Sequence, residues 1–574
     1  MREATLPPAA LPALRATGRA VLPVAVGAVA LLLLVLVLYP SVVLVLNAVT
    51  ADGRVTLQLL ARVAADSGAH RALVNSLVVS GSATAGGTVL GTVFAWLVTR
   101  TDLPGRGRWD TALLLPYMIP PFIGAIAWVY LLGPVGYLNQ AWRALTGAQE
   151  PLLVIYGPAG VVAVLTLYGY PIAYATMRGV LERMHPALEE AARIAGAGPA
   201  RVLREVTLPL MLPGVLAAAV LLFMSSLANF GIPAVIGFPA RYVVLPTKIY
   251  DTILNFDLPH NLQVAAALSL WLVAIAAVLL WSQRRLLRRA TFAVVTGQAG
   301  APTRLTLGRW RWPAVMGLGA FVLVSVLLPL AAILLTALTR AYGLAPAPEH
   351  LTLGHLRTAL LGIPKVQRAL VNSVGLAAGS ATLVVALGLV LGYLVERVRV
   401  RGAPLLELLV TIPYAVPGTV VALAMILAWL RPVPLVGLHL YNTIWILLVA
   451  YVARFLVFGF RTVMAGLAQV HPSLEEAARI SGATAREAFQ EVVLPILRPS
   501  LAAGWVLVFI PAVAELTLSV LLYSAGHETL GVVVFGLHEE GKIALSAAVA
   551  ALVTLLLVAL HLGVRAVAVR EVLP

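Results

Sequence analysis

Two polar segments of the chain carry the same pair of glutamates at the same distance from a His-Pro dipeptide. The first, called loop 1, reads HPALEEAARIAGAGPARVLREVTLP and runs from His185 to Pro209. The second, loop 2, reads HPSLEEAARISGATAREAFQEVVLP and runs from His471 to Pro495; fifteen of the 25 positions are identical. Lipid-facing helices tolerate many apolar exchanges. Identity concentrated in polar loops therefore predicts a shared contact with a partner.

Each loop has the pattern of two short helices separated by a glycine. Pro186 and Pro472 suit a first helical turn, and the helix dipole favours the acidic residues that follow them. Gly196 and Gly482 are typical residues of a helix C-terminus, where a positive φ is needed. The candidate contact residues of the two loops are Glu189, Glu190, Ala191, Gly196, Glu475, Glu476, Ala477 and Gly482.

A stretch near the C-terminus satisfies most of a nucleotide-binding P-loop pattern. It reads GLHEEGK and runs from Gly536 to Lys542. Ile543 stands where a serine or threonine would bind magnesium, and no soluble βαβ unit is available to hold the loop. The sequence therefore predicts no nucleotide site and no cofactor bound by this chain.

Metal-binding and catalytic patterns are also missing from the sequence. The ten histidines are scattered, and the chain contains no cysteine, which excludes disulfides and thiol-ligated metals. A lone histidine in a loop is more often a solvated residue than a ligand. We expect no metal site, and we find no convergent set of polar residues for a membrane-embedded enzyme.

Two charges fall inside predicted membrane spans, Arg454 and Glu515. Charge at membrane depth is costly and marks either a buried pair or a transport pathway; both alternatives remain open. The position equivalent to Glu515 in the first half of the chain is Asn229. The sequence therefore does not predict a symmetric ring along the pathway with an acidic residue from each half. The candidate pathway residues are Ser225, Ser226, Asn229, Arg454, Glu515 and Thr517.

The elements that must position these residues are membrane helices. The chain has 574 residues, of which 61% are hydrophobic and only 11% charged, and its mean hydropathy is +0.96. A spanning helix needs about 20 mostly apolar residues. We place such helices near 21–47, 73–99, 111–132, 158–181, 209–236, 262–283, 313–338, 370–395, 406–430, 440–464, 498–523 and 543–564. The first apolar run is too long for a signal-peptide core and is expected to stay as a span.

The charge pattern predicts an orientation. The net charge is +16, but the basic residues punctuate apolar runs and form no single basic face, which argues against a nucleic-acid partner. With the N-terminus in the cytoplasm and alternating spans, most basic residues fall on cytoplasmic segments, as the positive-inside rule requires. Both termini are therefore expected to be cytoplasmic, and the lipid bilayer is the expected surrounding.

The two halves of the chain repeat each other. The hexapeptide RALVNS at Arg71–Ser76 recurs at Arg368–Ser373, and Pro116-Tyr117 recurs as Pro413-Tyr414. Six helices per half give both copies the same orientation. We predict a first six-helix domain at 1–285, a basic linker at 286–312 and a second six-helix domain at 313–574. The first half holds extra residues in the loop around 139–151.

The loops resemble the EAA loop of bacterial ABC importer permeases. The matching residues are Glu190-Ala191-Ala192, Gly196, Val206, Leu208-Pro209, and their equivalents Glu476-Ala477-Ala478, Gly482, Val492, Leu494-Pro495. Valine replaces the isoleucine that is frequent in the family. The resemblance implies the type I importer fold, a bacterial cytoplasmic membrane, an extracytoplasmic substrate-binding protein and two copies of an ATPase subunit. In that family the loop docks in a groove of the ATPase, which uses the ATP and Mg²⁺.

Three further segments are similar to the fused permeases for ferric iron and thiamine. They are Thr101–Asp110, Leu115–Trp128 and Phe230–Tyr250. This resemblance implies import of Fe³⁺ by alternating access, with thiamine, aminoethylphosphonate and sugar phosphates as alternatives. A secondary transporter with two parallel repeats is the alternative from another class, although such a protein would not be expected to carry twin EAA loops.

Overall fold

The computed structural model describes residues 26–184, 187–289, 304–432, 437 and 439–572. The regular elements of these ranges are helices and one antiparallel pair of short strands, β1 (Thr50–Ala51) and β2 (Arg54–Val55). The helices of the first half are α2 (Tyr39–Ala48), α3 (Gln58–Ala65), α4 (Ser67–Arg100), α5 (Arg106–Leu114), α6 (Pro121–Leu132), α7 (Tyr137–Thr146), α8 (Pro158–Arg183), α9 (Ala187–Ile194), α10 (Pro199–Val202), α11 (Leu208–Leu227), α12 (Leu245–Leu254) and α13 (Asn261–Arg289). Those of the second half are α14 (Arg311–Val322), α15 (Leu328–Leu338), α16 (Gly354–Arg357), α17 (Pro364–Tyr393), α18 (Ala403–Ala415), α19 (Gly418–Trp429), α20 (Ile444–Gln469), α21 (Pro472–Ile480), α22 (Ala485–Ala488), α23 (Leu494–Val513), α24 (Ser519–Leu522), α25 (Leu530–Glu539) and α26 (Ile543–Val572).

The number of membrane-spanning helices agrees with the number predicted from the sequence. Eleven helices of the described residues are long and apolar enough to cross a membrane, and the bent pair of α18 and α19 makes twelve when it counts as one span. The predicted all-α integral membrane fold is confirmed. The predicted domain boundaries stay a prediction, and residues 290–303 of the linker lie outside the described residues.

Two predicted spans are interrupted at the repeated prolines. The span predicted at 111–132 is divided between α5, a 3₁₀ turn (Leu115–Met118) and α6. The span predicted at 406–430 is divided between α18 and α19, which meet at an angle of 108°. Pro120 and Pro417 occupy equivalent positions at these breaks. Proline has no N–H and clashes with the preceding turn, so the helix ends there although the hydropathy continues.

Two other predicted spans end early. The span predicted at 209–236 stops with α11 at Leu227 and continues only as the short helix η4 (Pro233–Gly237). The span predicted at 498–523 stops with α23 at Val513 and continues as α24. The breaks lie at Asn229 and Glu515, two of the candidate pathway residues. Both halves therefore contain a helix that is broken at the same repeat position.

The helices form two compact units, and these units are not the two repeats. Unit 1 contains Met1–Leu46, Gly375–Ala415 and Ala424–Ala512; unit 2 contains Asn47–Val374, Val416–Leu423 and Val513–Pro574. Each unit therefore includes helices from both halves of the sequence.

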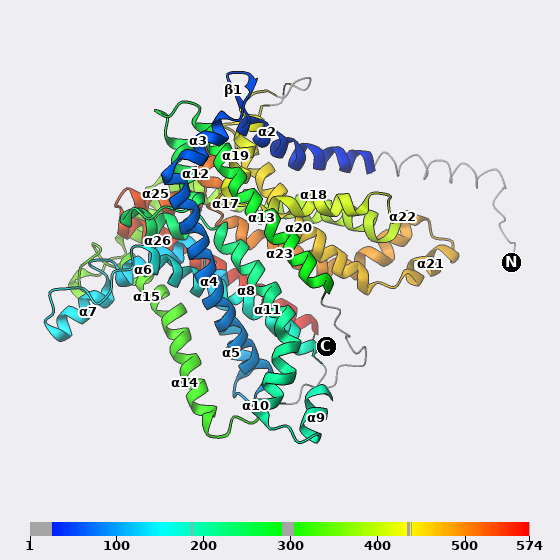
Figure 1. The fold of residues 1–574 in the computed structure, drawn as a ribbon, viewed down its shortest axis with the longest axis horizontal. Helices are drawn as coiled ribbons and strands as arrows, with labels where there is room; N and C mark the ends of the chain where they lie inside the picture. Colours follow the sequence, from blue (N-terminus) through cyan, green and yellow to red (C-terminus); the bar gives the residue numbers. More distant parts are fainter. Residues whose placement is uncertain (1–25, 185–186, 290–303, 433–436, 438, 573–574) are drawn as a thin grey trace. The chain divides into compact units, whose positions relative to one another are not determined.

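Unit 2 is built around α4, α8 and α11, which run side by side in Figure 1. Its core contains Phe94, Tyr170 and Met211 from these three helices. Leu318 of α14 is buried in the same core, and Phe321 packs against Phe94 with 4.7 Å between ring centroids. The first helix of the second repeat thus packs with first-repeat helices.

In unit 1 the opposite arrangement occurs, because a first-repeat helix packs with second-repeat helices. Val29 and Leu33 of the first helix, which runs over Val26–Ala48, are buried with Leu391, Leu409 and Phe460. The tyrosine hydroxyl of Tyr39 donates to the Ala428 carbonyl at 3.1 Å. The first helix of the first repeat is therefore part of a core supplied by the second repeat.

Glycines allow the closest helix contacts in both units. A Cβ at Gly91 of α4 would lie 2.6 Å from the backbone nitrogen of Tyr174 in α8. A Cβ at the equivalent Gly388 of α17 would lie 2.7 Å from the backbone carbonyl carbon of Gly459 in α20. Both distances are too short for any side chain. The absence of a side chain at these two positions lets the helix backbones approach this closely.

Candidate functional site: the two repeated loops

Loop 1 has the predicted shape over its described residues, which begin at Ala187. Helix α9 ends at Ile194, and Gly196 follows with φ of +85°. The Ala197 N–H donates back to the Ala192 carbonyl at 3.0 Å, which closes the helix end. A second helix then runs through α10 and a π-helical turn (Leu203–Thr207) into α11. His185 and Pro186 lie outside the described residues.

Loop 2 has the same shape. Helix α21 ends at Ile480, and Gly482 has φ of +100°. The second helix starts with a capping box, in which Thr484 and Glu487 each accept from the other's backbone N–H. It continues through a π-helical turn (Phe489–Val493) into α23. Only a residue that tolerates positive φ fits at the two glycine positions.

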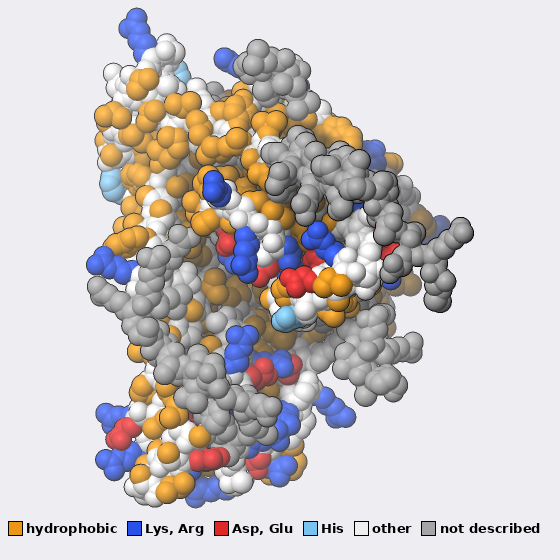
Figure 2. Space-filling view, turned by 90° about the vertical axis from the view of Figure 1, so that its right-hand side faces the viewer, with side chains coloured by type: hydrophobic (Ala, Val, Ile, Leu, Met, Phe, Trp, Pro, Cys, Tyr) orange, Lys and Arg blue, Asp and Glu red, His pale blue; other side chains and the backbone are white. Residues whose placement is uncertain are grey.

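The outer surfaces of the two loops match closely. Ile194 and Ile480 are 88% and 87% exposed, and Leu188 and Leu474 are 43% and 46% exposed. Glu190 and Glu476 are also exposed, and Figure 2 shows acidic and basic side chains gathered over these elements. Each loop therefore presents two aliphatic side chains beside a carboxylate. The aliphatic residues were not singled out from the sequence, although they belong to the identical part of the repeat.

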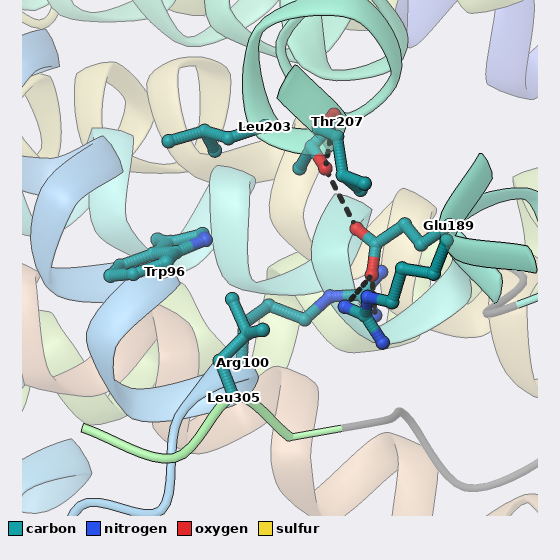
Figure 3. Close-up of a pocket in the computed structure, with 8 residues that line it drawn as sticks. Trp96, Arg100, Glu189, Leu203, Thr207 and Leu305 are labelled. Atoms are coloured by element: carbon teal, nitrogen blue, oxygen red, sulfur yellow. Dashed lines mark hydrogen bonds and ion pairs between the residues drawn. The ribbon is translucent and has the colours of Figure 1, made fainter. Parts of the chain in front are cut away.

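Glu189 does not lie on that outer surface. It is buried, and its Oε1 accepts a hydrogen bond of 2.8 Å from the Thr207 hydroxyl. Its Oε2 lies 3.7 Å from Nη1 of Arg100, the last residue of α4, and 3.8 Å from Nη2 of Arg193. Figure 3 shows Arg100 and Thr207 reaching Glu189 from two sides of a small pocket. The carboxylate thus ties loop 1 to α4 and to the start of α11.

Arg100 is the most buried charge of this arrangement. Only 1% of the residue is exposed, and its Nη2 donates to the Met184 carbonyl at 3.3 Å. Its Nε and Nη1 make no hydrogen bond within the described residues, so Glu189 is the group that balances the charge. Removing one partner of a buried pair leaves an uncompensated charge and costs about 3–5 kcal/mol.

The linker touches the same place. The Leu305 N–H donates to the Arg100 carbonyl at 2.9 Å, and the Asp102 N–H donates to the Leu305 carbonyl at 3.1 Å. The Asp102 carboxylate accepts from the Leu307 N–H at 2.8 Å. The end of the linker is therefore fixed beside the anchor of loop 1.

Loop 2 is anchored differently. The hydroxyl of Tyr393 in α17 donates to Oε1 of Glu475 at 2.7 Å. Arg397 is the repeat equivalent of Arg100, and its Nη2 donates to the carbonyls of Leu467, at 3.2 Å, and Val470. Val470 is equivalent to Met184, so both arginines bind the carbonyl just before their loop. Glu475 in loop 2 therefore accepts from a phenol, whereas the equivalent Glu189 in loop 1 pairs with an arginine.

The candidate pathway residues Asn229 and Glu515 have the same role in the two halves. The Asn229 side-chain oxygen accepts from the Ile232 N–H at 3.0 Å. The Glu515 carboxylate accepts from the Leu518 N–H at 2.8 Å, and from the N–H and hydroxyl of Ser519 at 3.0 and 2.9 Å. Each side chain caps the short helix that follows the break. Both caps therefore hold a helix break in place.

The other pathway candidates vary in exposure. Ser226 is buried, Ser225 is exposed and Thr517 is intermediate. The guanidinium carbon of Arg454 lies 6.0 Å from the ring centre of Tyr414. Arg454 belongs to unit 1 and Glu515 to unit 2, so their pairing stays a prediction.

The repeated RALVNS motif binds a second pair of short helices. The Asn75 amide donates to the Val243 carbonyl at 2.9 Å, and the Ser76 hydroxyl accepts from the Leu245 N–H at 2.7 Å, at the start of α12. Asn372 and Ser373 make the same two bonds, to the Glu528 carbonyl at 3.0 Å and from the Leu530 N–H at 2.8 Å, at the start of α25. The motif was visible in the sequence only as a repeat.

The comparisons with known proteins agree with these paired elements. The family model described as "Binding-protein-dependent transport system inner membrane component" matches residues 87–292 and again 384–571. The chain belongs to this family. The two matches confirm the predicted fused permease of an ABC importer, and the family is one of bacterial inner membrane components.

Several permeases are similar in sequence to this chain. The "Ferric transport system permease protein FbpB" of Actinobacillus pleuropneumoniae is 26% identical over 537 residues, covering 93% of this chain and 76% of that protein. The "Probable ABC transporter permease protein y4fN" of Sinorhizobium fredii is 28% identical, covering 81% of each chain. The "Molybdenum transport system permease protein ModB" of Escherichia coli is 32% identical over 213 residues, which is 36% of this chain.

Proposed function

We propose that this permease imports Fe³⁺ that an external binding protein delivers. The observation that carries the proposal is the similarity to ferric permeases along 93% of the chain, including both family domains. Membership of a binding-protein-dependent family removes the secondary transporter considered as an alternative. Thiamine, aminoethylphosphonate and sugar phosphates remain the competing substrates within the same class.

Two copies of an ATPase subunit supply the energy, one at each loop. The support is the matching outer surface of the loops, in which Ile194 and Ile480 are almost fully exposed. An exposed aliphatic side chain beside a carboxylate fits an apolar groove with a polar rim. Both termini and the linker are cytoplasmic in this arrangement, and the partner ATPase uses the ATP and Mg²⁺.

Closure of the ATPase subunits moves the loops and reorients the helices. Loop 1 transmits this movement to α4 and α11, because Glu189 is held by Arg100 and by Thr207. Loop 2 transmits it to α17, because Glu475 is held by Tyr393. The broken helices at Asn229 and Glu515 are the elements that change the access of the pathway.

Selectivity resides in the binding protein. Fe³⁺ is a hard cation that prefers oxygen ligands, and a tight site in the membrane would trap it. Glu515 is the acidic candidate of the pathway, and its carboxylate already accepts three hydrogen bonds from the helix that it caps. Ser225, Ser226 and Asn229 offer only weakly coordinating oxygens. A path lined by such groups, with Thr517 and Arg454, allows release.

Uptake into proteoliposomes tests the proposal. The liposomes hold the permease and its ATPase, and the cognate binding protein is added outside. We expect ATP-dependent accumulation of ⁵⁵Fe. Accumulation of thiamine or a phosphonate without ⁵⁵Fe would refute iron import and leave the assignment as a permease intact.

A further inference from the structure

Helix α7 uses three of its polar side chains to bind backbone groups of its own loop. It follows α6 in the loop that is longer in the first half. The amide of Asn139 is fully buried, donates to the carbonyls of Gly133 and Leu153 at 2.8 Å and accepts from the Leu153 N–H at 3.2 Å. Gln140 donates to the Val135 carbonyl at 2.7 Å, and Arg143 donates to the Pro134 carbonyl at 3.1 Å.

The outward side of α7 is apolar. Leu138, Trp142 and Leu145 follow one another at intervals of four and three residues, which places them on one face. Trp142 is 37% exposed and Leu145 is 86% exposed. The returning segment adds Leu152, Leu153 and Val154, all exposed, and Asn139 ties this segment to the helix. A helix with polar groups inside and apolar groups outside is unfavourable in water, because about 25 cal/mol is lost for each Å² of exposed apolar surface.

The position of α7 coincides with the end of a membrane-spanning helix. The span Gly308–Leu338 ends with α15, and its Thr336 hydroxyl donates to the Tyr137 hydroxyl at 3.1 Å. Tyr137 is the first residue of α7, and its hydroxyl also lies 3.5 Å from that of Thr339. Figure 1 shows α7 at the edge of its unit, beyond α6 and α15. Helix α7, which forms the candidate span Pro121–Thr146 together with α6, therefore begins beside the end of the span that α15 completes.

The same end of the unit lies far from loop 1. Helix α8 separates the two, starting at Pro158 just after the α7 segment and ending at Arg183 just before the loop. Its 26 residues extend over about 39 Å at 1.5 Å per residue. Helix α7 is therefore at the membrane surface opposite to the ATPase-facing loop.

We propose that α7 and residues 152–154 lie in the lipid headgroup region of that surface, with Trp142 and Leu145 inserted into the bilayer. Amphipathic helices of this kind bury their apolar face about 5–10 Å into the boundary, and tryptophan is enriched at this depth. Gln140 and Arg143 lie on the opposite side of the helix, where they bind the carbonyls of Val135 and Pro134, so they leave the inserted face apolar. The occupant of this surface is lipid, and the surface is independent of which substrate the permease carries.

Single cysteines test the proposal, since the chain has none of its own. Leu145→Cys is labelled with a fluorophore, and the chain is placed in phosphatidylcholine nanodiscs that contain doxyl-labelled lipid. Gln149→Cys, at an exposed polar position of the same loop, is the matched control. We expect severalfold stronger quenching at position 145 than at 149, and stronger quenching by a doxyl group near the headgroup than near the chain end.

Aqueous iodide supplies the opposite measurement. It should quench the label at position 149 severalfold more than the label at 145, and Trp142→Cys should behave as Leu145→Cys does. Equal quenching of all labels by iodide would overturn the proposal. So would a label at 145 that is exposed to water in nanodiscs and becomes protected only when the binding protein is added, because the surface would then be a protein docking site.

Discussion

Loops 1 and 2 are alike on the outside and different on the inside. Their exposed leucines and isoleucines agree in exposure to within a few per cent, and both turns use a glycine with positive φ. Inside, loop 1 is held by a buried arginine and a threonine, whereas loop 2 is held by the Tyr393 phenol. The comparison shows that the outer surface of the loops has been kept while the connection to the membrane helices has changed.

The glycine turns should be equally indispensable in the two loops. Gly196→Pro and Gly482→Pro should each abolish uptake while the chain still inserts, because proline cannot adopt φ of +85° or +100°. The measurement is ATPase activity stimulated by the binding protein in proteoliposomes. Gly196→Asn is the control, since asparagine tolerates this conformation, and it should keep most of the activity. Normal stimulation in either proline variant would show that the loop does not couple.

The two arginines should differ in effect. Arg100→Met leaves the buried Glu189 carboxylate with only the partly exposed Arg193 and the Thr207 hydroxyl as partners, and should lower the free energy of unfolding by up to about 3–5 kcal/mol. Arg397→Met removes hydrogen bonds to two carbonyls and should cost roughly 1–3 kcal/mol. Thermal unfolding in nanodiscs gives both values.

A double variant sharpens this comparison. Arg100→Met combined with Glu189→Gln removes both charges, so part of the stability should return. Strictly additive losses, or equal losses for Arg100→Met and Arg397→Met, would mean that the charge pair does not anchor loop 1.

The exposed isoleucines should contribute equally to ATPase binding. Replacing Ile194 or Ile480 with serine removes one aliphatic side chain from each docking surface and should weaken binding of the ATPase by about 1.5–3 kcal/mol. Titration of the ATPase into permease nanodiscs measures the affinity. Ser481→Ala, at an exposed polar position beside Ile480, is the control. Unequal effects of the two isoleucines would contradict the matching surfaces.

The smallest effects should come from the neutral anchors. Thr207→Val copies loop 2, where the equivalent residue is Val493, and removes one hydrogen bond from Glu189. Tyr393→Phe removes the hydrogen bond to Glu475. Each should reduce stability by roughly 1.5 kcal/mol, the lower end of the range for a hydrogen bond to a charged group, and Thr207→Val should have the larger effect because Glu189 is the more buried carboxylate. A larger loss for Tyr393→Phe than for Arg100→Met would reverse the proposed order of the anchors.

The sequence was sufficient for the spans and the loops because both depend on local patterns. Long apolar runs predict helices, and the repeated Glu-Glu-Ala-Ala segments predict the paired turns. The breaks at Pro417 and Glu515 could not be found in this way. The mean hydropathy of a span hardly changes when the backbone dihedral angles of one or two residues leave the helical range. Glu189 was named as a contact residue because it belongs to the repeated loop, and only the fold brings Arg100 close enough to pair with it in the interior.

The polarity of α7 and the composition of the two units depend on contacts that the residue pattern does not reveal. Gln140 and Arg143 would be read as a solvated face, yet backbone carbonyls of the preceding turn receive their N–H groups. No local signal indicates that Val29 packs with Leu391 or that Phe321 packs with Phe94. Such pairings are set by the complementarity of whole helices.

The first helix of each repeat packs with helices of the other repeat, and this arrangement has a consequence for biosynthesis. Val29 is translated before Leu391 and Phe460, which bury it and which follow it by more than 360 residues. At about 5–20 residues per second, the ribosome needs roughly 20–70 s to reach them. During this time the first helix stays in the bilayer without its final neighbours. A chain divided at the linker into two separately translated halves would have to find those neighbours by lateral diffusion.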